Sequence, residues 1–464
     1  MIRFFSEFHD PFVDYALGLI SFFCKEKILR IDKNVDSGIY YGTARHENIG
    51  LVIPRVERYD LATIPYTIRK DYMHAASHQD SPFPFDIFSA MRFWLADEGN
   101  RNYVPKEGFD LHGRLIRKYS AQYKKGVLEK PIVNEYLMLL KMWLKIRLKN
   151  PLGSYLPSGK KCMVVLSHDV DKPINPGDPY EWYHAVKGYL GKGKIMLAAR
   201  NTSSFLRRKL KDPSNKDRCW LFHEVMESEA KLGVRSTFFF AAKSINGPNS
   251  SLFDVNYNLS SPRFVKVIRA ILERGFEVGL HLSYNANQKS DYIAKEKETL
   301  ERIAGCQVIG NRHHFWKMKR PFWHTLEDHK TAGLLYDTSI AFNELPGYRL
   351  GIALPFYPWN PENSQRIDVV QIPTVLMDGA FFYEETLSSS EVVLKFKNIL
   401  EGLKKNEGAA CIDWHVHTSY PGSKEFRAWG EGYLALLHFL VEDSEVLICN
   451  GERALQVFLE SWSP

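Results

Sequence analysis

Two carboxylates lie close together directly after an apolar run in the second half of the chain. The run MVVLS (163–167) leads into His168, Asp169 and, two residues later, Asp171. Ionised carboxylates at the end of a buried strand are unfavourable unless another charge compensates them. A divalent metal ion would compensate them; the structural alternative is a pair of loop aspartates that cap the next helix. The spacing therefore favours a metal site or acid–base chemistry.

Further histidines and charged residues follow later apolar runs in the same half. His281 ends the run EVGLH, and His415 ends the run AACIDWH. The segment 312–314, Arg-His-His, follows the run QVIG. Each of these residues alone could be a satisfied core side chain. If the runs are parallel strands of one barrel, their C-terminal ends meet at one mouth, and we expect the side chains to converge there.

The runs that carry these residues alternate with amphipathic helices. One predicted helix begins at Ser261 and Pro262 and ends at Gly275, with apolar residues at helical spacing between them. Strands that alternate with helices indicate an α/β fold with parallel strands, and this number of units favours a barrel. The predicted strands are MVVLS (163–167), STFFF (236–240), EVGLH (277–281), QVIG (307–310), DVVQI (368–372), AACIDWH (409–415) and EVLICN (445–450).

A segment rich in proline and glycine, residues 151–161, separates this half from the first. Before it, short strands are predicted within residues 25–54, and helices are predicted near Asp86 and after Pro131. We expect a small N-terminal α/β domain of unknown role over residues 1–155 and a distorted (β/α) barrel over residues 156–464. The histidines of the first part are scattered, so no chemistry is predicted there.

A basic stretch, residues 187–218, interrupts the second half as an apparent insertion. It contains ten lysines or arginines and two aspartates, and it includes RRKLK at 207–211. The simplest interpretation is a solvated helical excursion. The functional alternative is a patch that contacts a membrane surface, a lipid-linked substrate or an anionic glycan. Because no nucleic-acid-binding motif accompanies the charge, no nucleic acid partner is expected.

The composition is that of an ordinary globular protein. The 464 residues are 45% hydrophobic and 25% charged, with a formal charge of +7, which excludes a disordered or collagen-like chain. Six cysteines without a Cys-x-x-Cys pair argue against clustered structural zinc and fit reduced thiols. Acidic residues interrupt the apolar N-terminus, so neither a signal peptide nor a transmembrane segment is predicted. We expect a cytoplasmic protein.

Eight segments of the chain resemble, in order, the motif series of one enzyme family. They are VVLSHDVDKP, STFFFAA, GFEVGLHLSYNA, GNRHHFW, AGLLYDTSIAF, GYRLG, QIPTVLMDGAFF and IDWHVHTSYP. The chain resembles the polysaccharide deacetylase family (NodB homology, carbohydrate esterase family 4), and most of all the branch whose first motif reads Ser/Thr-His-Asp-Val-Asp. The N-terminal half, with YYGTARH, FPFDIFSAM, GFDLHGR and KPIVNEYL, is similar to the domain that often precedes the catalytic one in that branch.

This resemblance implies a metal-dependent hydrolase in a distorted (β/α) barrel of the polysaccharide deacetylase type. Asp171 and His281 would be metal ligands, and Asp169 would be the general base that takes a proton from metal-bound water, the nucleophile. Arg312 would pair with this base and keep it ionised. His415 would be the general acid that protonates the leaving amine. The implied cofactor is one divalent ion, with zinc first and cobalt, nickel or manganese as alternatives.

The second and third motifs depart from the family pattern. The second motif has Asn285 where the family usually has a second histidine ligand. An amide oxygen is a weaker and harder donor than imidazole. Either the third ligand is Asn285, His313 or His314, or the site binds metal poorly. The Arg-x-Pro of the third motif is replaced by Arg312-His313-His314.

Several supporting roles stay open. The carboxylate that orients His415 could be Asp337, Asp378 or Asp413, and His168 is assigned a structural role. The candidates for substrate contacts are Tyr284, Trp414 and Arg349, although a tryptophan is more often part of the core and Arg349 could simply close a turn.

The first function predicted is removal of an N-acetyl group from a carbohydrate, here a glycan biosynthetic intermediate, to give a free amino sugar and acetate. One alternative is a metal amidohydrolase acting on a small non-sugar amide, because His415-Val416-His417 resembles the His-x-His of that superfamily. The other is a non-catalytic glycan-binding relative with a decayed metal site, which Asn285 would explain. The convergence of several costly polar groups argues against decay.

Overall fold

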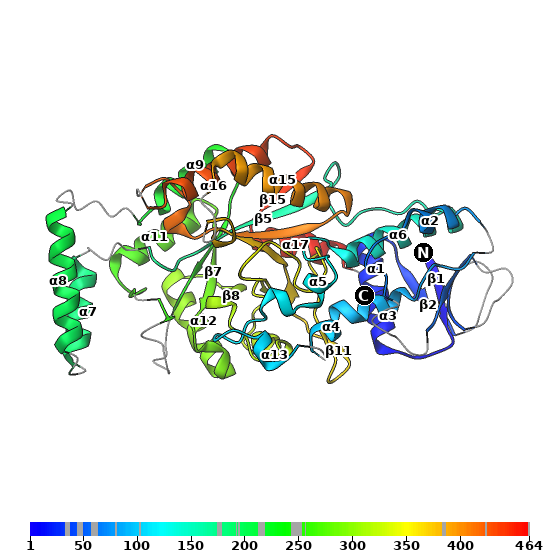
Figure 1. Cartoon of the computed structure of the whole chain (residues 1–464), viewed down its shortest axis with the longest axis horizontal. Helices are drawn as coiled ribbons and strands as arrows, with labels where there is room; N and C mark the ends of the chain where they lie inside the picture. The colour runs from blue at the N-terminus through cyan, green and yellow to red at the C-terminus, as the bar shows by residue number, and fades with distance from the viewer. Residues whose placement is uncertain are drawn as a thin grey trace.

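The chain builds two parallel β-sheets, one in each part of the sequence, with helices packed around them (Figure 1). The computed structural model describes residues 1–32, 38–43, 50–56, 64–78, 81–101, 104–173, 179–191, 193, 195–211, 219–242, 253–255, 257–382, 387–422 and 425–462. The N-terminal sheet lies at one end of the molecule, and the larger sheet forms its centre.

The N-terminal sheet has four parallel strands in the order β2-β1-β3-β4. Its bounds are β1 Ile2–Ser6, β2 Ile28–Arg30, β3 Ile39–Gly42 and β4 Leu51–Pro54. The apolar N-terminus forms β1 and helix α1, which buries eleven of its fourteen residues. The helices of this part are α1 Pro11–Cys24, α2 Lys70–Ala75, α3 Ile87–Leu95, α4 Glu98–Arg101, α5 Ala121–Lys124 and α6 Ile132–Leu148.

The larger sheet has nine strands, and every strand pair in it is parallel. The order is β12-β9-β8-β7-β6-β5-β14-β13, with β15 paired to the start of β5. The bounds are β5 Cys162–Asp169, β6 Thr237–Phe240, β7 Glu277–Leu282, β8 Gly310–His313, β9 Tyr336–Asp337, β12 Val370–Gln371, β13 Thr374–Met377, β14 Ala409–Asp413 and β15 Val446–Cys449.

One continuous segment joins the two edges of this sheet. Strands β12 and β13 lie at opposite edges but are separated in sequence only by Ile372 and Pro373. Ile372 N donates to Asp337 O at 2.9 Å, and Cys411 N donates to Pro373 O at 2.8 Å. The segment therefore pairs first with β9 and then with β14, and it bends the sheet into a barrel. The predicted α/β fold, a distorted (β/α) barrel, is confirmed.

The helices that follow the strands cover the outside of the barrel (Figure 1). The predicted helix after Ser261 is α11: it begins at Pro262, buries Phe264 and Ile268, and is followed by Gly275 at φ 75°. The covering helices are α9 Phe222–Lys231, α11 Pro262–Glu273, α12 Ser290–Ala304, α13 Trp323–Thr331, α15 Ser389–Lys405, α16 Arg427–Val441 and α17 Gly451–Ser461.

Two strand predictions differ from the structure. The strand predicted at 307–310 begins at Gly310 and runs through His313, so Arg312 belongs to the strand and not to the loop after it. An ion-paired arginine is stable inside the barrel, which an apolar pattern does not anticipate. Strands β9 and β13 were not predicted. Strand β9 has only two residues and is defined by its pairing with β8 and β12, and strand β13 is defined by its pairing with β14.

The basic stretch predicted at 187–218 overlaps a helical hairpin that begins earlier, at Pro179. Helices α7 Pro179–Gly191 and α8 Ile195–Lys211 lie side by side at the end of the molecule opposite the N-terminal sheet (Figure 1). Residues 192, 194 and 212–218 of the predicted insertion, and the side chains of RRKLK at 207–211, lie outside the described residues. Among the helices that are described, none is both long enough and apolar enough to cross a membrane.

Candidate metal centre and active site

Three side chains from separate elements bring ligand atoms together at the C-terminal ends of the barrel strands. Asp171 follows β5, His281 lies in β7, and His314 follows β8. Asp171 Oδ1 lies 3.2 Å from His281 Nε2 and 3.3 Å from His314 Nδ1. The two histidine nitrogens are 2.9 Å apart. One carboxylate oxygen and two imidazole nitrogens thus lie close enough together to bind one metal ion.

The protein orients His314 with a hydrogen bond to the backbone. His314 Nε2 lies 2.8 Å from Phe253 O, and a carbonyl can only accept. Nε2 therefore carries the proton, which leaves the lone pair of Nδ1 facing Asp171 and His281. A hydrogen bond from the second ring nitrogen to a carbonyl is the usual arrangement for a histidine that binds a metal.

The carboxylates and histidines of this site change one another's pKa values. Burial opposes ionisation of Asp171, but the nearby His314, His281 and His415 outweigh it and hold the pKa of Asp171 well below its usual range. Burial likewise opposes protonation of His281, but the carboxylates of Asp169 and Asp171 raise the pKa of His281. The Asp171 carboxylate is therefore ionised, as a metal ligand must be.

The donor set fits a small divalent ion. Ligands at about 2.0–2.1 Å in a tetrahedral arrangement lie about 3.3 Å from one another. The three separations here, 2.9, 3.2 and 3.3 Å, are close to that spacing. Asp171 Oδ1 is buried and accepts no hydrogen bond from the residues that the structure describes, so a cation would satisfy it. Two imidazole nitrogens and one carboxylate oxygen suit zinc.

Asp169, Asp413 and His415 form a second group of close ligand atoms. There, however, Arg312 Nη1 lies 2.9 Å from Asp169 Oδ1 and 2.9 Å from Asp413 Oδ1. The guanidinium already supplies the positive charge between these carboxylates, so we assign no metal to this group.

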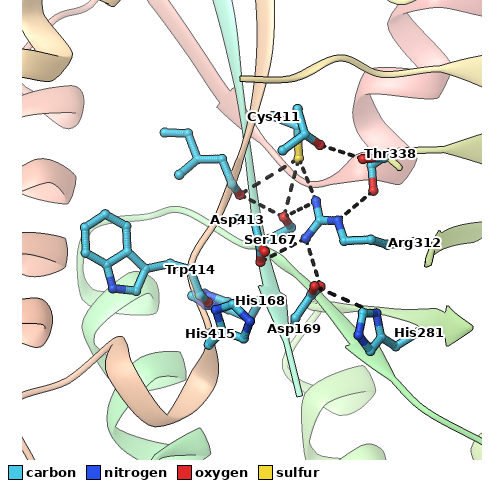
Figure 2. Close-up of polar contacts among 12 residues, drawn as sticks. Ser167, His168, Asp169, His281, Arg312, Thr338, Cys411, Asp413, Trp414 and His415 are labelled. Atoms are coloured by element: carbon cyan, nitrogen blue, oxygen red, sulfur yellow. Dashed lines mark hydrogen bonds and ion pairs between the residues drawn. The ribbon is translucent and has the colours of Figure 1, made fainter. Parts of the chain in front are cut away.

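Arg312 is fully buried and makes polar contacts with several side chains around the site (Figure 2). Besides its two carboxylates, its Nη2 donates to Ser167 Oγ at 2.8 Å and its Nε donates to Thr338 Oγ1 at 2.9 Å. Asp169 Oδ1 is thereby held in place, while its Oδ2 lies 3.8 Å from His281 Nδ1, on the side of the ligand set.

His415 lies next to Asp171. Its Nε2 is 3.3 Å from Asp171 Oδ2, and its Nδ1 is 3.0 Å from Asp378 Oδ1. Asp378 also accepts from the backbone N of His415 at 3.0 Å and from Thr418 Oγ1 at 2.5 Å. Burial opposes protonation of His415, but Asp378 and Asp413 outweigh it and hold its pKa well above the usual value.

Of the three carboxylates left open as partners of His415, the structure selects Asp378. Asp337 is directed elsewhere: it accepts from Ser339 Oγ at 2.6 Å and lies 3.6 Å from His329 Nδ1. Asp413 faces Arg312, and burial together with the charge of Asp169 raises the pKa of Asp413 to about 7.

Asn285 and His313 are placed away from the ligand atoms. The Oδ1 of Asn285 accepts from Gln288 Nε2 at 2.9 Å and faces Lys317 Nζ at 3.5 Å, so the oxygen that a metal would need is engaged. His313 is stacked on His329, with 2.8 Å between their Nε2 atoms. Of the three candidates for the third ligand, only His314 joins Asp171 and His281.

The candidates for substrate contact are used for packing. The ring of Trp414 is fully buried against Phe382 and Tyr433, so it offers no free face to a sugar. Tyr284 is buried, and its hydroxyl lies 3.0 Å from His112 Nδ1 of the N-terminal part. The guanidinium of Arg349 makes a two-point ion pair with Asp97 at 2.7 and 2.9 Å. Contact of these three residues with a sugar stays a prediction.

Several supporting residues had no recognisable signal in the sequence. Phe253 acts through its backbone carbonyl, which any residue type provides. His168 points away from Asp169: its Nε2 is 2.7 Å from Glu229 Oε1 and its Nδ1 is 2.6 Å from Trp414 O. Glu229 lies on helix α9, in an ordinary amphipathic pattern. Asp378, by contrast, was among the candidates from the sequence, and it directly follows β13.

Comparison with known proteins gives a limited match. Residues 17–149 match a family described as a family of unknown function (DUF7033). No curated protein matches the chain.

The similar solved structures include a Mycobacterium smegmatis protein described as a polysaccharide deacetylase, with 18% identity, a TM-score of 0.41 and coverage of 67% of this chain and 94% of that one. The Puue allantoinase has 12% identity, a TM-score of 0.41 and coverage of 66% and 93%. A carbohydrate esterase family 4 pseudoenzyme from Bacillus anthracis has 10% identity, a TM-score of 0.31 and coverage of 64% and 66%. Likenesses this distant assign no activity to this chain.

Proposed function

We propose that the chain is a divalent-metal-dependent hydrolase that removes an N-acetyl group from a carbohydrate. One observation carries the proposal: three metal-type ligand atoms lie 2.9–3.3 Å apart, with Asp169 beside His281 and His415 beside Asp171. This arrangement has the parts that amide hydrolysis needs, which are a site for an electrophile, a base and an acid.

Asp171, His281 and His314 would hold the ion, with zinc as the first candidate. When bound, a divalent ion polarises the acyl oxygen of the substrate and makes hydroxide available near neutral pH. Asn285, whose amide oxygen is engaged, is left out of the proposed ligand set. His417 belongs to neither group of candidate ligands in the described part of the chain, which disfavours the amidohydrolase alternative.

Asp169 would act as the general base. Its Oδ1 is held by Arg312, so its Oδ2 is the oxygen free to accept a proton from the attacking water. The ion pair also keeps the carboxylate in one orientation, because the guanidinium packs on the rings of Phe239 and Trp316, 4.6 and 5.2 Å from their centroids.

His415 would act as the general acid. Asp378 binds Nδ1, so Nε2 is the nitrogen that donates a proton to the leaving amine. Protonation of His415 is favoured by Asp378 and Asp413. The products would be acetate and an amino sugar with a free amine.

The N-acetylated sugar as substrate rests on the resemblance of the eight segments to polysaccharide deacetylases. The proposal includes a catalytic unit at 156–464, a preceding unit at 1–155 and a cytoplasmic location, which the six free cysteines support. A biosynthetic glycan intermediate is the substrate expected in that compartment.

Metal content tests the first half of the proposal. Protein purified without chelators should contain about one divalent ion per chain by plasma mass spectrometry. Asp171→Asn and His314→Gln should lose the ion, because each replaces a strong ligand with a neutral amide, which is a weaker donor. Asn285→Ala is the matched control and should retain it. Retention in both ligand variants would contradict this ligand set. No ion after incubation with zinc, cobalt, nickel or manganese would favour the non-catalytic relative.

Acetate release tests the second half. The enzyme should release acetate from N-acetylated sugars, and Asp169→Asn should lower the rate by about 100-fold or more while the metal is retained. A panel of free, nucleotide-linked and lipid-linked sugars, together with cyclic ureides, separates the substrates. Hydrolysis of ureides alone would show a different amidohydrolase, and acetate release only from mature polymer would contradict a biosynthetic role.

A further inference from the structure

The α7–α8 hairpin has a small core of its own. The ring of Trp182 stacks on Phe205, with ring centroids 4.8 Å apart and planes 16° from parallel. Trp182 Nε1 donates to Thr202 Oγ1 at 3.2 Å, and Ala198 is buried. These contacts satisfy the inner faces of both helices. The apolar residues near the turn between the helices are not part of this core.

Large apolar side chains are exposed on both sides of that turn. Leu190 is 53% exposed near the end of α7, and Ile195 and Met196 are 70% and 86% exposed at the start of α8. Met196 is the most exposed large apolar side chain among the described residues. Single exposed apolar residues are ordinary, but three grouped at the tip of a projecting hairpin mark an interaction surface. We call Leu190, Ile195 and Met196 the apolar tip.

The charge of the hairpin indicates what the tip contacts. Residues 179–211 contain eight lysines or arginines and one acidic residue, Glu181. Lys187 and Arg200 are exposed on the two helices, within about one and a half turns of the tip. A second copy of the hairpin would bring the same positive charge against itself, which disfavours self-association. A glycan would satisfy the charge but would leave the apolar tip in water.

We propose that the α7–α8 hairpin docks the protein on a membrane surface that contains anionic phospholipid. Leu190, Ile195 and Met196 enter the boundary between headgroups and acyl chains, and the basic residues contact the phosphates. Apolar side chains next to basic ones are the combination that binds this interface, because burial and charge attraction add. The inference is independent of the metal site, since the hairpin contributes none of its residues.

Vesicle co-sedimentation tests this proposal with the full chain. The protein should bind vesicles of phosphatidylcholine with about one third phosphatidylglycerol, and it should bind pure phosphatidylcholine at least about tenfold more weakly. The double variant Ile195→Ser/Met196→Ser should lose about tenfold or more in partition coefficient. Lys187→Glu and Arg200→Glu should each weaken binding by about fivefold or more.

The matched control is Leu394→Ser on α15, where a leucine 63% exposed lies outside the hairpin. It should bind vesicles like the wild type, and all variants should keep the wild-type metal content and circular dichroism. Absence of vesicle binding by the wild type, or equal losses in the tip and control variants, would overturn the proposal. A dimer in light scattering that the tip variant converts to a monomer would also overturn it, since the tip would then be covered by a second copy.

Discussion

At the residue scale, the proposed chemistry depends on which atom of each side chain faces Asp171. Phe253 O fixes Nδ1 of His314 as the free nitrogen, and Asp378 fixes Nε2 of His415. Arg312 in the same way leaves Oδ2 of Asp169 free. In each of these side chains, one polar atom is bound by a neighbouring group, and the other polar atom is left for the chemistry. Such outer contacts orient metal ligands and catalytic groups.

Replacing Asp378 tests this orientation directly. In Asp378→Asn, an amide replaces the carboxylate that faces His415 Nδ1, so the proton of the imidazole is no longer held on that nitrogen. We expect kcat to fall by about 100-fold or more, with KM and metal content close to wild type.

The control for this prediction is Asp337→Asn. Asp337 is an equally buried aspartate at the end of barrel strand β9, but it faces Ser339 and His329 and not His415. Its variant should keep kcat. Equal losses in Asp337→Asn and Asp378→Asn would show that any buried charge here matters only for folding.

The sequence identified the kinds of residue at the site better than their partners. The rule that polar residues at strand ends converge predicts the neighbourhood of Asp171, His281 and His314, because it depends only on parallel strands. It cannot distinguish Asp378 from Asp337, since both end strands of the same sheet. Residue type alone also gives no information about packing. Trp414 and Arg349 are types that suit sugar binding, but Trp414 packs against Tyr433 and Arg349 pairs with Asp97.

At the element scale, long apolar strands were predictable and short ones were not. Strand β5 has eight buried residues and is visible as a continuous run. Strand β9 has two, and its place is determined by β8 and β12 on either side. The closure of the barrel therefore depends on contacts that no local pattern contains.

Glu277 at the start of β7 shows how several elements are held at the other end of the barrel. It accepts from Thr237 of β6 at 2.6 Å, from Tyr336 of β9 at 2.7 Å and from Glu452 N of α17 at 2.8 Å. Full burial raises the pKa of Glu277 above its ordinary value of 4.5, despite these donors. The folded protein thus retains the proton to a higher pH than the unfolded chain does.

This pKa has a defined effect on stability. The contribution of Glu277 is complete below its unfolded pKa and is lost as pH rises through its folded pKa. Glu277→Gln cannot ionise, so its free energy of unfolding should improve relative to wild type as pH rises above the unfolded pKa of Glu277, with a slope of at most about 1.4 kcal/mol per pH unit. Urea unfolding at several pH values measures this difference, and a constant difference across the range would contradict it.

At the scale of the whole molecule, the N-terminal sheet and the barrel share one hydrophobic core. Trp359 lies between β9 and β12 in sequence, in the short strand β10 (Trp359–Asn360). It packs against Phe12 and Tyr15 of α1, with ring centroids 5.2 and 5.1 Å away. Tyr15 Oη donates to Tyr357 O at 2.9 Å. The continuous core crosses residue 155, so the two sheets are not independently covered.

A shared core predicts that the two parts unfold together, although the sequence suggests two domains. Trp359→Ala should lower the free energy of unfolding by about 3–5 kcal/mol, because it leaves a cavity between the parts. Hydrogen exchange should then accelerate in α1 and in β5 alike, since one cooperative unit responds as a whole. Leu111→Ala, at a side chain 76% exposed, is the control and should stay within about 0.5 kcal/mol of wild type. Faster exchange in β5 with unchanged protection of α1 would contradict this prediction. The N-terminal part would then be stable without the contact of Trp359.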